Sequence, residues 1–280
     1  MKILLSGATG YIGRNLKREL EMNGHNVIPL KIFLPNGKNL VEQKKFIDRN
    51  LQNLKIREQN IDVFIHLAWM NTNDWNSEQH LSVNLPLSYY LIERLSGFGV
   101  PKFVCVGSCL EYGKLEGKLD EGREVKPFNN YAKAKIRLFE GLQNLSIHKG
   151  FSLSWLRLFY VYGGDQPENT LFGSLKKHLK QKNHVFSMSG GQQVRDYLHI
   201  KEVCFKISLI ASHINAPEVI NICSGKAITL EEHIRSWLRT LEAPKDFVLE
   251  IGALPYRADE PFKFWGCTRI FSKFQSNVLL

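Results

Sequence analysis

The chain opens with the sequence MKILLSGATGYIGRNLKREL, residues 1–20, and this stretch decides the fold. A short apolar run at residues 3–5 is followed by the glycine pattern GATGYIG and then by apolar residues at helical spacing. The order predicts a buried strand, a tight glycine turn and a helix. Free amides at a helix N-terminus hold phosphate oxygens well, so the stretch predicts a dinucleotide site.

The three glycines have separate tasks in such a turn. One makes the turn, one lets the backbone approach a pyrophosphate, and one lets the helix pack against the strand. The alternative is a glycine turn that holds no ligand, and the rest of the chain must decide between the two. The expected cofactor contacts in this stretch are Gly7, Gly10, Tyr11, Ile12, Gly13 and Arg14.

Composition narrows the class of protein. The chain has 280 residues, 44% of them hydrophobic, which is enough for one large domain or a domain with a lobe. It contains no apolar run near the roughly 20 residues that span a bilayer, and its first apolar run is too short for a signal peptide. We therefore expect a cytoplasmic protein without membrane contact.

Charge and cysteine content argue against a nucleic-acid-binding protein and against a metal-binding protein. The net charge is +10, but Lys and Arg are scattered and form no stripe, so small anionic molecules are better partners than nucleic acid. The five cysteines are odd in number and lack metal-ligand spacing, which predicts reduced thiols and no metal site.

Alternating strands and helices follow the first helix. Residues 27–30, 61–68 and 102–106 read as strands, and residues 81–95 as a helix. Residues 38–60 read as a connector and a short polar helix, so a third strand is missing there. The alternation predicts an α/β fold, a Rossmann-type doubly wound parallel sheet, in which ligands bind beyond the carboxyl ends of the strands.

Two basic residues bear on the choice of cofactor. An acid at the end of the second strand would hold a ribose 2′-hydroxyl, whereas a base accommodates a 2′-phosphate. This chain has Lys31 at that position, and Arg14 follows the last glycine. Both favour NADP(H) over NAD(H), although NAD(H) stays possible because two solvated basic side chains would look the same.

A tyrosine and a lysine share a face of the helix expected at residues 131–149. Tyr131 and Lys135 are four residues apart and point the same way, whereas Lys133 does not. An ammonium beside a phenol lowers the phenol pKa, which suits proton transfer near neutrality. Ser108 ends a sheet strand and can orient a substrate carbonyl. The predicted catalytic residues are therefore Ser108, Tyr131 and Lys135.

Further motifs accompany these residues in a fixed order along the chain. The set is Gly7-x-x-Gly10-x-x-Gly13, His66-Leu67-Ala68, Gly107-Ser108, Tyr112-Gly113, Tyr131-x-x-x-Lys135, residues 157–163, residues 190–197, residues 221–225 and Pro255-Tyr256-Arg257. Jointly, these motifs resemble the extended short-chain dehydrogenase/reductase family, which includes nucleotide-sugar epimerases, dehydratases and reductases, and the resemblance covers nearly the whole chain. It implies that Tyr131 is the acid/base, that Lys135 also holds the nicotinamide ribose, and that Ser108 steadies the substrate oxygen. Leu67 and Ala68 join the expected cofactor contacts.

The C-terminal motifs imply a nucleotide-diphosphate sugar as partner. Arg195 and Arg257 fall where the family places arginines on the diphosphate, and guanidinium forks suit phosphate. The alternative is structural ion pairing, since Asp196 and Asp259 are close in sequence. The expected substrate contacts are Trp69, Ser108, Cys109, Phe159, Tyr160, Arg195 and Arg257; many relatives have asparagine in place of Tyr160.

The resemblance also implies a division of the chain. We expect a dinucleotide-binding Rossmann domain at residues 1–162, continued by residues 193–223. Residues 163–192 and 224–280 are expected to form a smaller, discontinuous nucleotide-sugar lobe. Relatives commonly dimerise through two helices of each subunit, so we expect a homodimer.

Departures from the family pattern narrow the set of family reactions that this chain can catalyse. Dehydratases carry an Asp-Glu pair where this chain has Cys109 and Leu110, and leucine cannot transfer a proton. Epimerising reductases carry a cysteine and a histidine where we align Leu110 and Asp165. In this family 4-epimerases usually retain NAD and reductases often use a dissociable NADPH, so Lys31 favours a reductase. The chain most resembles the family's reductases, which implies NADPH-dependent reduction of the C4 keto group of a nucleotide-linked 4-keto-6-deoxyhexose, for deoxysugars of surface polysaccharide such as O-antigen. The alternatives are a 4-epimerase with retained NAD and a non-catalytic NADP-binding regulatory protein on the same fold.

Overall fold

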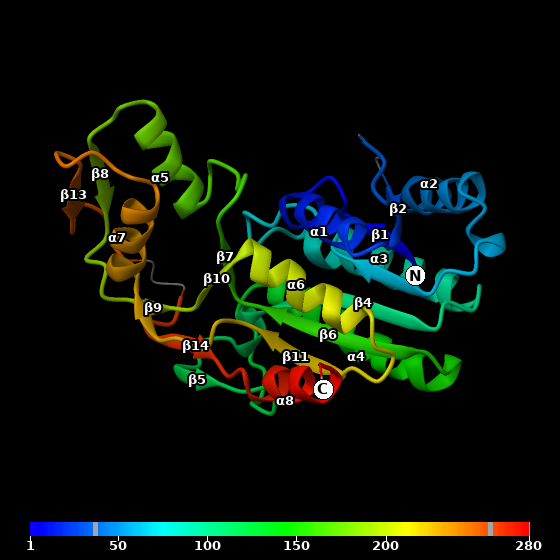
Figure 1. Cartoon of the computed structure of the whole chain (residues 1–280). Helices are drawn as coiled ribbons and strands as arrows, with labels where there is room; N and C mark the ends of the chain where they lie inside the picture. The colour runs from blue at the N-terminus through cyan, green and yellow to red at the C-terminus, as the bar shows by residue number, and fades with distance from the viewer. Residues whose placement is uncertain (36–38, 257–259, 280) are drawn as a thin grey trace.

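The computed structural model describes residues 1–35, 39–256 and 260–279. Within them, six strands form a central sheet in the order β2, β1, β3, β4, β6, β11, and every neighbouring pair is parallel (Figure 1). This confirms the predicted Rossmann-type doubly wound sheet. The strands are β1 Lys2–Ser6, β2 Asn26–Leu30, β3 Val63–His66, β4 Lys102–Ser108, β6 Ser152–Leu158 and β11 Val219–Ile222.

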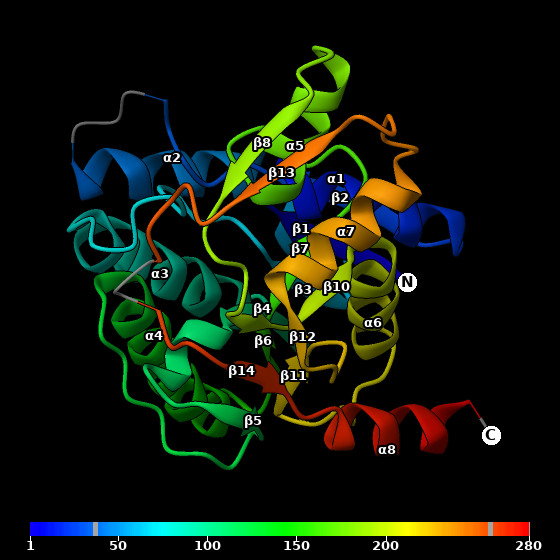
Figure 2. The same ribbon diagram turned by 90° about the vertical axis from the view of Figure 1, so that its left-hand side faces the viewer.

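Helices cover both faces of the sheet (Figures 1 and 2). One face packs against α1 Tyr11–Met22, α6 Ile200–Ala211 and α8 Arg269–Val278. The other packs against α2 Leu40–Asn53, α3 Leu85–Ser96 and α4 Asn130–Lys149. Apart from the edge strand β2, where Asn26 and Pro29 are exposed, the strands therefore bury both of their sides, which is why they read as continuous apolar runs in the sequence.

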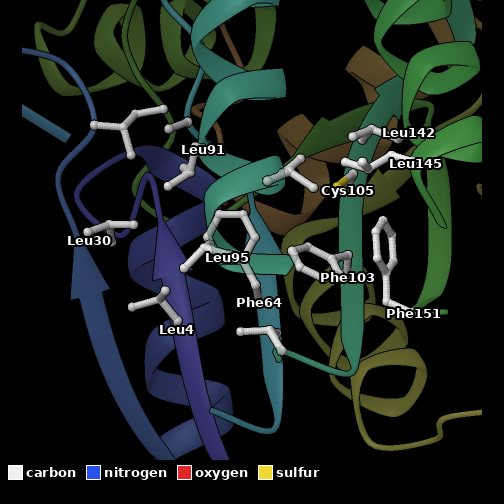
Figure 3. Packing of buried hydrophobic residues seen from close by; sticks show 14 of the residues in the cluster. Leu4, Leu30, Phe64, Leu91, Leu95, Phe103, Cys105, Leu142, Leu145 and Phe151 are labelled. Carbon is white, nitrogen blue, oxygen red and sulfur yellow. The ribbon is translucent and has the colours of Figure 1, made fainter. Parts of the chain in front are cut away.

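Strand alternation sorts the apolar side chains between the two faces. Ile3 and Leu5 belong to the cluster under α1 and α6, whereas Leu4 belongs to the cluster under α2 and α3. The register places Leu4, Phe64 and Phe103 side by side on three neighbouring strands. Figure 3 shows these three side chains near Leu95 of α3, with Leu91 above them.

The missing third strand is confirmed within the described residues. From β2 the chain passes through α2 and a 3₁₀ turn, Ile56–Glu58, to β3 on the far side of β1. One prediction needs correction, since the expected helix 81–95 begins with a π-helical turn, His80–Asn84, before α3. Within residues 193–223, β10 Tyr197–His199 pairs with β7 Tyr160–Tyr162 and not with the central sheet, whereas β11 joins the sheet.

A smaller lobe lies beyond the carboxyl ends of the strands (Figure 1). It contains α5 Leu171–Lys180, β8 Val185–Met188, α7 Leu230–Thr240 and β13 Val248–Ile251. Its own apolar core includes Phe172, Leu175, Phe186, Ile234 and Trp237. Two strand pairs lie between lobe and sheet: β9 Val194–Arg195 with β12 Ile228–Thr229, and β5 Gly117–Leu119 with β14 Phe264–Gly266.

A buried aspartate joins several chain segments at the junction of the lobe and the sheet. The Asp196 carboxylate is fully buried and accepts hydrogen bonds from the backbone amides of Ser224 (2.7 Å), Gly225 (2.9 Å) and Gly266 (3.1 Å). Three segments distant in the sequence are thereby fixed at one point. Asp196 therefore satisfies backbone donors and is not the partner in the structural ion pair considered as the alternative for Arg195.

The glycine turn sets the distance between β1 and α1. Gly7 has φ +75°, which favours glycine, and a Cβ there would lie 2.7 Å from the amide nitrogen of Ala68. A Cβ on Gly13 would lie 2.0 Å from the carbonyl oxygen of Gly7. Both contacts are with backbone, which cannot swing aside as a flexible side chain could.

We predict that Gly13→Ala lowers the free energy of unfolding by about 3 kcal/mol, because the added methyl forces helix and turn apart. Gly10→Ala is the matched control, since a Cβ there meets only the Gly7 carbonyl oxygen, at 3.3 Å, and φ is −74°. Denaturant unfolding of both variants measures the difference. Equal stability of the two variants would contradict this account of the turn.

Candidate active site

The N-terminus of α1 is suited to a pyrophosphate. Its N-cap is Gly10; within the described structure no side chain caps the helix there, and its first turn carries no acidic residue. The first backbone amides of a helix have no intrahelical partner, so those of Tyr11, Ile12 and Gly13 can donate to an anion. A Cβ on Gly7 or Gly13 would clash with neighbouring backbone, so the tight form of this turn requires glycine at both positions. The turn thus fits the cofactor phosphates that the sequence predicts.

Leu67 and Ala68 lie against this turn, as the contact between Gly7 and Ala68 shows. A buried chain of hydrogen bonds holds the end of β3 in place: Ser6 Oγ to His66 Nδ1 at 2.8 Å, and His66 Nε2 to Ser88 Oγ at 2.9 Å. Burial lowers the pKa of His66 to about 3, so the ring is neutral. The structure therefore brings Leu67 and Ala68 beside the glycines.

The two basic residues expected at the cofactor have different surroundings. The register Ser6–Leu30 between β1 and β2 puts Lys31 at the edge of the sheet next to the turn, and Lys31 is exposed. Arg14 is engaged elsewhere: its Nη2 lies 2.8 Å from Asp165 Oδ2. Hydrogen bonds from Asn15 and Arg14 lower the pKa of Asp165. The sequence did not indicate this ion pair, because 151 residues separate its partners.

Ser108, Tyr131 and Lys135 meet at the carboxyl edge of the sheet. Ser108 ends β4 and caps the 3₁₀ turn η3 Cys109–Tyr112, with its Oγ 3.2 Å from the amide of Leu110. Tyr131 and Lys135 lie in the first turns of α4, and the Lys135 Nζ is 5.7 Å from the centroid of the Tyr131 ring. That Nζ donates to the carbonyl oxygen of Val106 at 2.7 Å. The exposed Lys133 points away, as expected.

The pKa of Tyr131 shifts in the direction opposite to the sequence prediction. Burial, and then the negative charge of Glu111, raises the pKa of Tyr131, so the expected lowering by Lys135 is wrong. Burial likewise lowers the pKa of Lys135 to about 7, against the opposing influence of Glu111. Desolvation outweighs the ammonium here because it penalises the charged form of both groups. Tyr131 is thus held as the neutral phenol, the form that donates a proton.

Glu111 is a site residue that the sequence analysis missed. Its carboxylate is fully buried and accepts from the Ser108 amide (2.7 Å), from Arg157 Nε (3.0 Å) and from Trp155 Nε1 (3.1 Å). Only spatial proximity reveals this network, because Trp155 and Arg157 are more than 40 residues away in the chain. The network fixes the backbone that presents Ser108.

Three expected substrate contacts form one buried group beside Ser108. Cys109 and Phe159 share an apolar cluster, against which Tyr160 packs. The Tyr160 hydroxyl is buried and has no hydrogen-bond partner among the described residues. A buried polar group without a partner is costly, and a bound ligand would supply one.

Arg195 lies near this group but is paired within the chain. Its Nη2 lies 2.7 Å from Glu260 Oε2, its Nη1 donates to the Phe262 carbonyl oxygen at 3.1 Å, and its guanidinium stacks over Phe264. Arg257 and Asp259 lie outside the described residues. Of the two predicted phosphate-binding arginines, the structure describes Arg195, and it forms the structural ion pair that was the alternative, with Glu260 as its partner.

Trp69 lies against the catalytic pair. The Lys135 Nζ is 3.7 Å from the centroid of the indole, and the Tyr131 ring meets the indole edge-on at 6.0 Å. Trp69, an expected substrate contact, therefore touches Lys135 directly.

The structure also bears on other classes of site. All five cysteines are buried and none forms a disulfide, which agrees with the reduced thiols that the sequence predicts. Across residues 1–35, 39–256 and 260–279, no three His, Cys, Asp or Glu side chains gather as a metal site would require. In the same residues no helix has the length and apolar character needed to span a bilayer.

Comparison with known proteins places this geometry in a family. Residues 3–223 match the model of the NAD dependent epimerase/dehydratase family. A dTDP-6-deoxy-L-talose 4-dehydrogenase (NAD(+)) of Aggregatibacter actinomycetemcomitans is 25% identical, covering 95% of this chain and 99% of its own. An uncharacterized UDP-glucose epimerase of Bacillus subtilis (strain 168) is 30% identical, covering 86% and 84%.

A solved structure shows the same fold. The UDP-N-acetylglucosamine 4-epimerase of Methanobrevibacter ruminantium M1, in complex with UDP-N-acetylmuramic acid, superposes with a TM-score of 0.80 at 21% identity. The match covers 97% of this chain and 91% of that one.

Proposed function

The chain belongs to the NAD dependent epimerase/dehydratase family, and we propose that it reduces the C4 keto group of a nucleotide-linked 4-keto-6-deoxyhexose with NADPH. The observation that carries this proposal is the meeting of Ser108, neutral Tyr131 and Lys135 at the carboxyl edge of the sheet, next to the glycine turn. More broadly, the chain is an NAD(P)-dependent enzyme that acts on a nucleotide sugar.

The surroundings of Tyr131 favour hydride transfer over water elimination. Elimination needs a second acid–base group beside the serine, where this chain has Cys109 and Leu110. Leu110 is buried and cannot transfer a proton, and burial raises the pKa of the Cys109 thiol. Tyr131 is then the proton donor, and a keto reduction requires one proton.

The chain's residues have distinct roles in this reaction. NAD(P)H, when bound, supplies the hydride. Ser108 donates a hydrogen bond to the C4 oxygen and orients the carbonyl. Tyr131 gives its proton to that oxygen as negative charge develops on it. Lys135, whose pKa is about 7, resupplies the proton to Tyr131 and contacts the ribose hydroxyls.

The talose dehydrogenase relative supports this choice of reaction. Its name specifies oxidation at C4 of a dTDP-6-deoxyhexose, which is the proposed hydride transfer in the opposite direction. Its name also specifies NAD(+), whereas a relative from Kitasatospora kifunensis is named for NAD(P)(+). The preference for NADPH in this chain therefore rests on Lys31, the basic residue beside the turn.

The nucleotide-diphosphate sugar is proposed to lie between sheet and lobe. Its hexose would contact Trp69, Cys109 and Phe159, and the Tyr160 hydroxyl would find its missing partner there. Arg195 is proposed to contact the diphosphate, and Arg257 is carried over from the resemblance alone. The product is proposed to serve surface polysaccharide synthesis in the cytoplasm.

The protein is proposed to form a homodimer, with helices α3 and α4 of each subunit at the interface.

A 4-epimerase is the second candidate, favoured by the 30% identity to a protein named as a UDP-glucose epimerase. The same three residues would serve it, because epimerisation also passes through a 4-keto sugar. An epimerase keeps its NAD through the cycle, whereas a reductase must exchange its cofactor. Cofactor released by denaturing the purified protein separates the two: bound NAD indicates the epimerase.

We predict that the purified protein oxidises NADPH only when a 4-keto-6-deoxy sugar nucleotide is present, and that Tyr131→Phe lowers kcat about 100-fold or more because the phenolic proton is lost. The assay follows absorbance at 340 nm with dTDP-, CDP- and GDP-linked substrates. Lys133→Met is the control, since Lys133 is exposed on the other side of the helix. Full activity of Tyr131→Phe, or no turnover of any of the three substrates, would refute the proposal.

We predict that Lys31→Glu raises the KM for NADPH about tenfold and leaves the KM for NADH unchanged or lower, because a charge-assisted contact to the 2′-phosphate is lost. Lys149→Glu is the control, since Lys149 ends α4 at the opposite edge of the sheet. Steady-state kinetics with both cofactors measure the ratio. An unchanged ratio would leave the NADPH assignment without support and favour NAD.

A further inference from the structure

The position of Trp69 is unusual for a side chain expected to contact only substrate. Its indole face covers the Lys135 ammonium, with the Nζ 3.7 Å from the ring centroid. Lys135 is buried, and a buried ammonium needs compensation for the hydration it has lost. The Val106 carbonyl oxygen provides one contact and the electron-rich indole face provides another.

The indole is itself held by a buried histidine. Trp69 Nε1 donates to His80 Nδ1 at 3.0 Å, and the two rings are stacked with centroids 6.3 Å apart. His80 is fully buried, and its Nε2 lies 2.8 Å from the carbonyl oxygen of Asp74. Accepting at Nδ1 and donating at Nε2 is the pattern of the neutral ring, and burial lowers the pKa of His80 accordingly.

The loop that carries Trp69 is held by hydrogen bonds at two points, Met70 and Trp75. Asn84, four residues after His80 in the π-helical turn, holds both backbone groups of Met70, its Oδ1 accepting from the amide at 3.0 Å. Farther along, the Trp75 carbonyl oxygen accepts from the amide of Tyr131 at 2.9 Å. The loop is thus joined directly to the catalytic turn of α4, so Trp69 has little freedom to leave Lys135.

We propose that Trp69 is a positioning residue for the proton-transfer pair: its indole face holds the Lys135 ammonium beside Tyr131, and His80 fixes the indole in that place. The proposal deepens the function proposed above and rests on it. It assigns to the loop at residues 69–80 a role in proton transfer in addition to substrate contact.

Other groups also act on Lys135 and must be separated from Trp69 in any pH experiment. They are the ionisable side chains on the elements packed around it: Tyr131, Glu111, Cys105, His66 and His80. His66 and His80 have lowered pKa values, and Cys105 and Tyr131 have raised ones, so their titrations lie away from that of Lys135. Burial raises the pKa of Glu111 as well, so this carboxyl is the group that the variants must separate from Lys135, and the Trp69 and Lys135 variants all leave it in place.

The first test uses the protein alone and needs no substrate. Because a charge against an indole changes its emission, we expect a tryptophan fluorescence transition with its midpoint near pH 7 in the wild type. The transition should vanish in Trp69→Phe and in Lys135→Met and persist in Trp265→Phe, the control. His80→Leu should reduce its amplitude about twofold or more, because the indole N–H loses its acceptor, while His213→Leu should leave it unchanged. A transition absent from the wild type, or persisting in Lys135→Met or Trp69→Phe, would overturn the proposal, and a full amplitude in His80→Leu would overturn the role of His80.

The second test measures how the rate of the catalysed reaction depends on pH. Trp69→Leu removes the contact that favours the charged lysine, so the basic limb of the kcat/KM profile should move about one pH unit toward lower pH. A change in KM without that movement would show a substrate contact only and overturn the proposal. If the wild type turns over no 4-keto sugar nucleotide, the proposed function fails, while the fluorescence result still decides the role of Trp69.

Discussion

The buried ammonium of Lys135 is the group on which the site depends. A lysine within the sheet–helix interface loses its hydration, and burial lowers its pKa to about 7. Three neighbouring elements stabilise the ammonium and compensate for the lost hydration. The Val106 carbonyl oxygen of β4 accepts a hydrogen bond from it, the Trp69 ring in the loop after β3 packs against it, and the charge of Glu111 in η3 attracts it. The parallel sheet makes this possible, because the carboxyl ends of β3 and β4 and the N-terminus of α4 meet at one edge.

The same burial governs Tyr131. Desolvation and the nearby carboxylate keep the phenol neutral, which suits a group that donates a proton to a developing alkoxide. Glu111 connects the two effects, since its oxygens also hold the Ser108 amide and the Arg157 side chain. Ser108, Tyr131 and Lys135 are therefore parts of one electrostatic arrangement.

Much of this could be predicted from the sequence, because it depends on local spacing. The glycine turn, the apolar strands, the missing third strand and the shared face of Tyr131 and Lys135 follow from periodicity over a few residues. The pairs that the sequence did not indicate join distant segments: Arg14 with Asp165, Arg195 with Glu260, Glu111 with Arg157. The pKa of Tyr131 was predicted in the wrong direction for a related reason. Spacing indicates a neighbouring charge, whereas the depth of burial that outweighs it is a property of the folded chain.

The central claim is a net transfer of hydride to C4 of a nucleotide-linked sugar, and isotope transfer measures it directly. The protein is incubated with NADPH deuterated at the transferring position of nicotinamide C4 and a 4-keto-6-deoxy sugar nucleotide, and the product is examined by mass spectrometry and proton NMR. The account predicts one deuterium at C4 of the hexose for each NADPH oxidised. A sugar without deuterium at C4, or an epimerised sugar formed with no NADPH consumed, would contradict it.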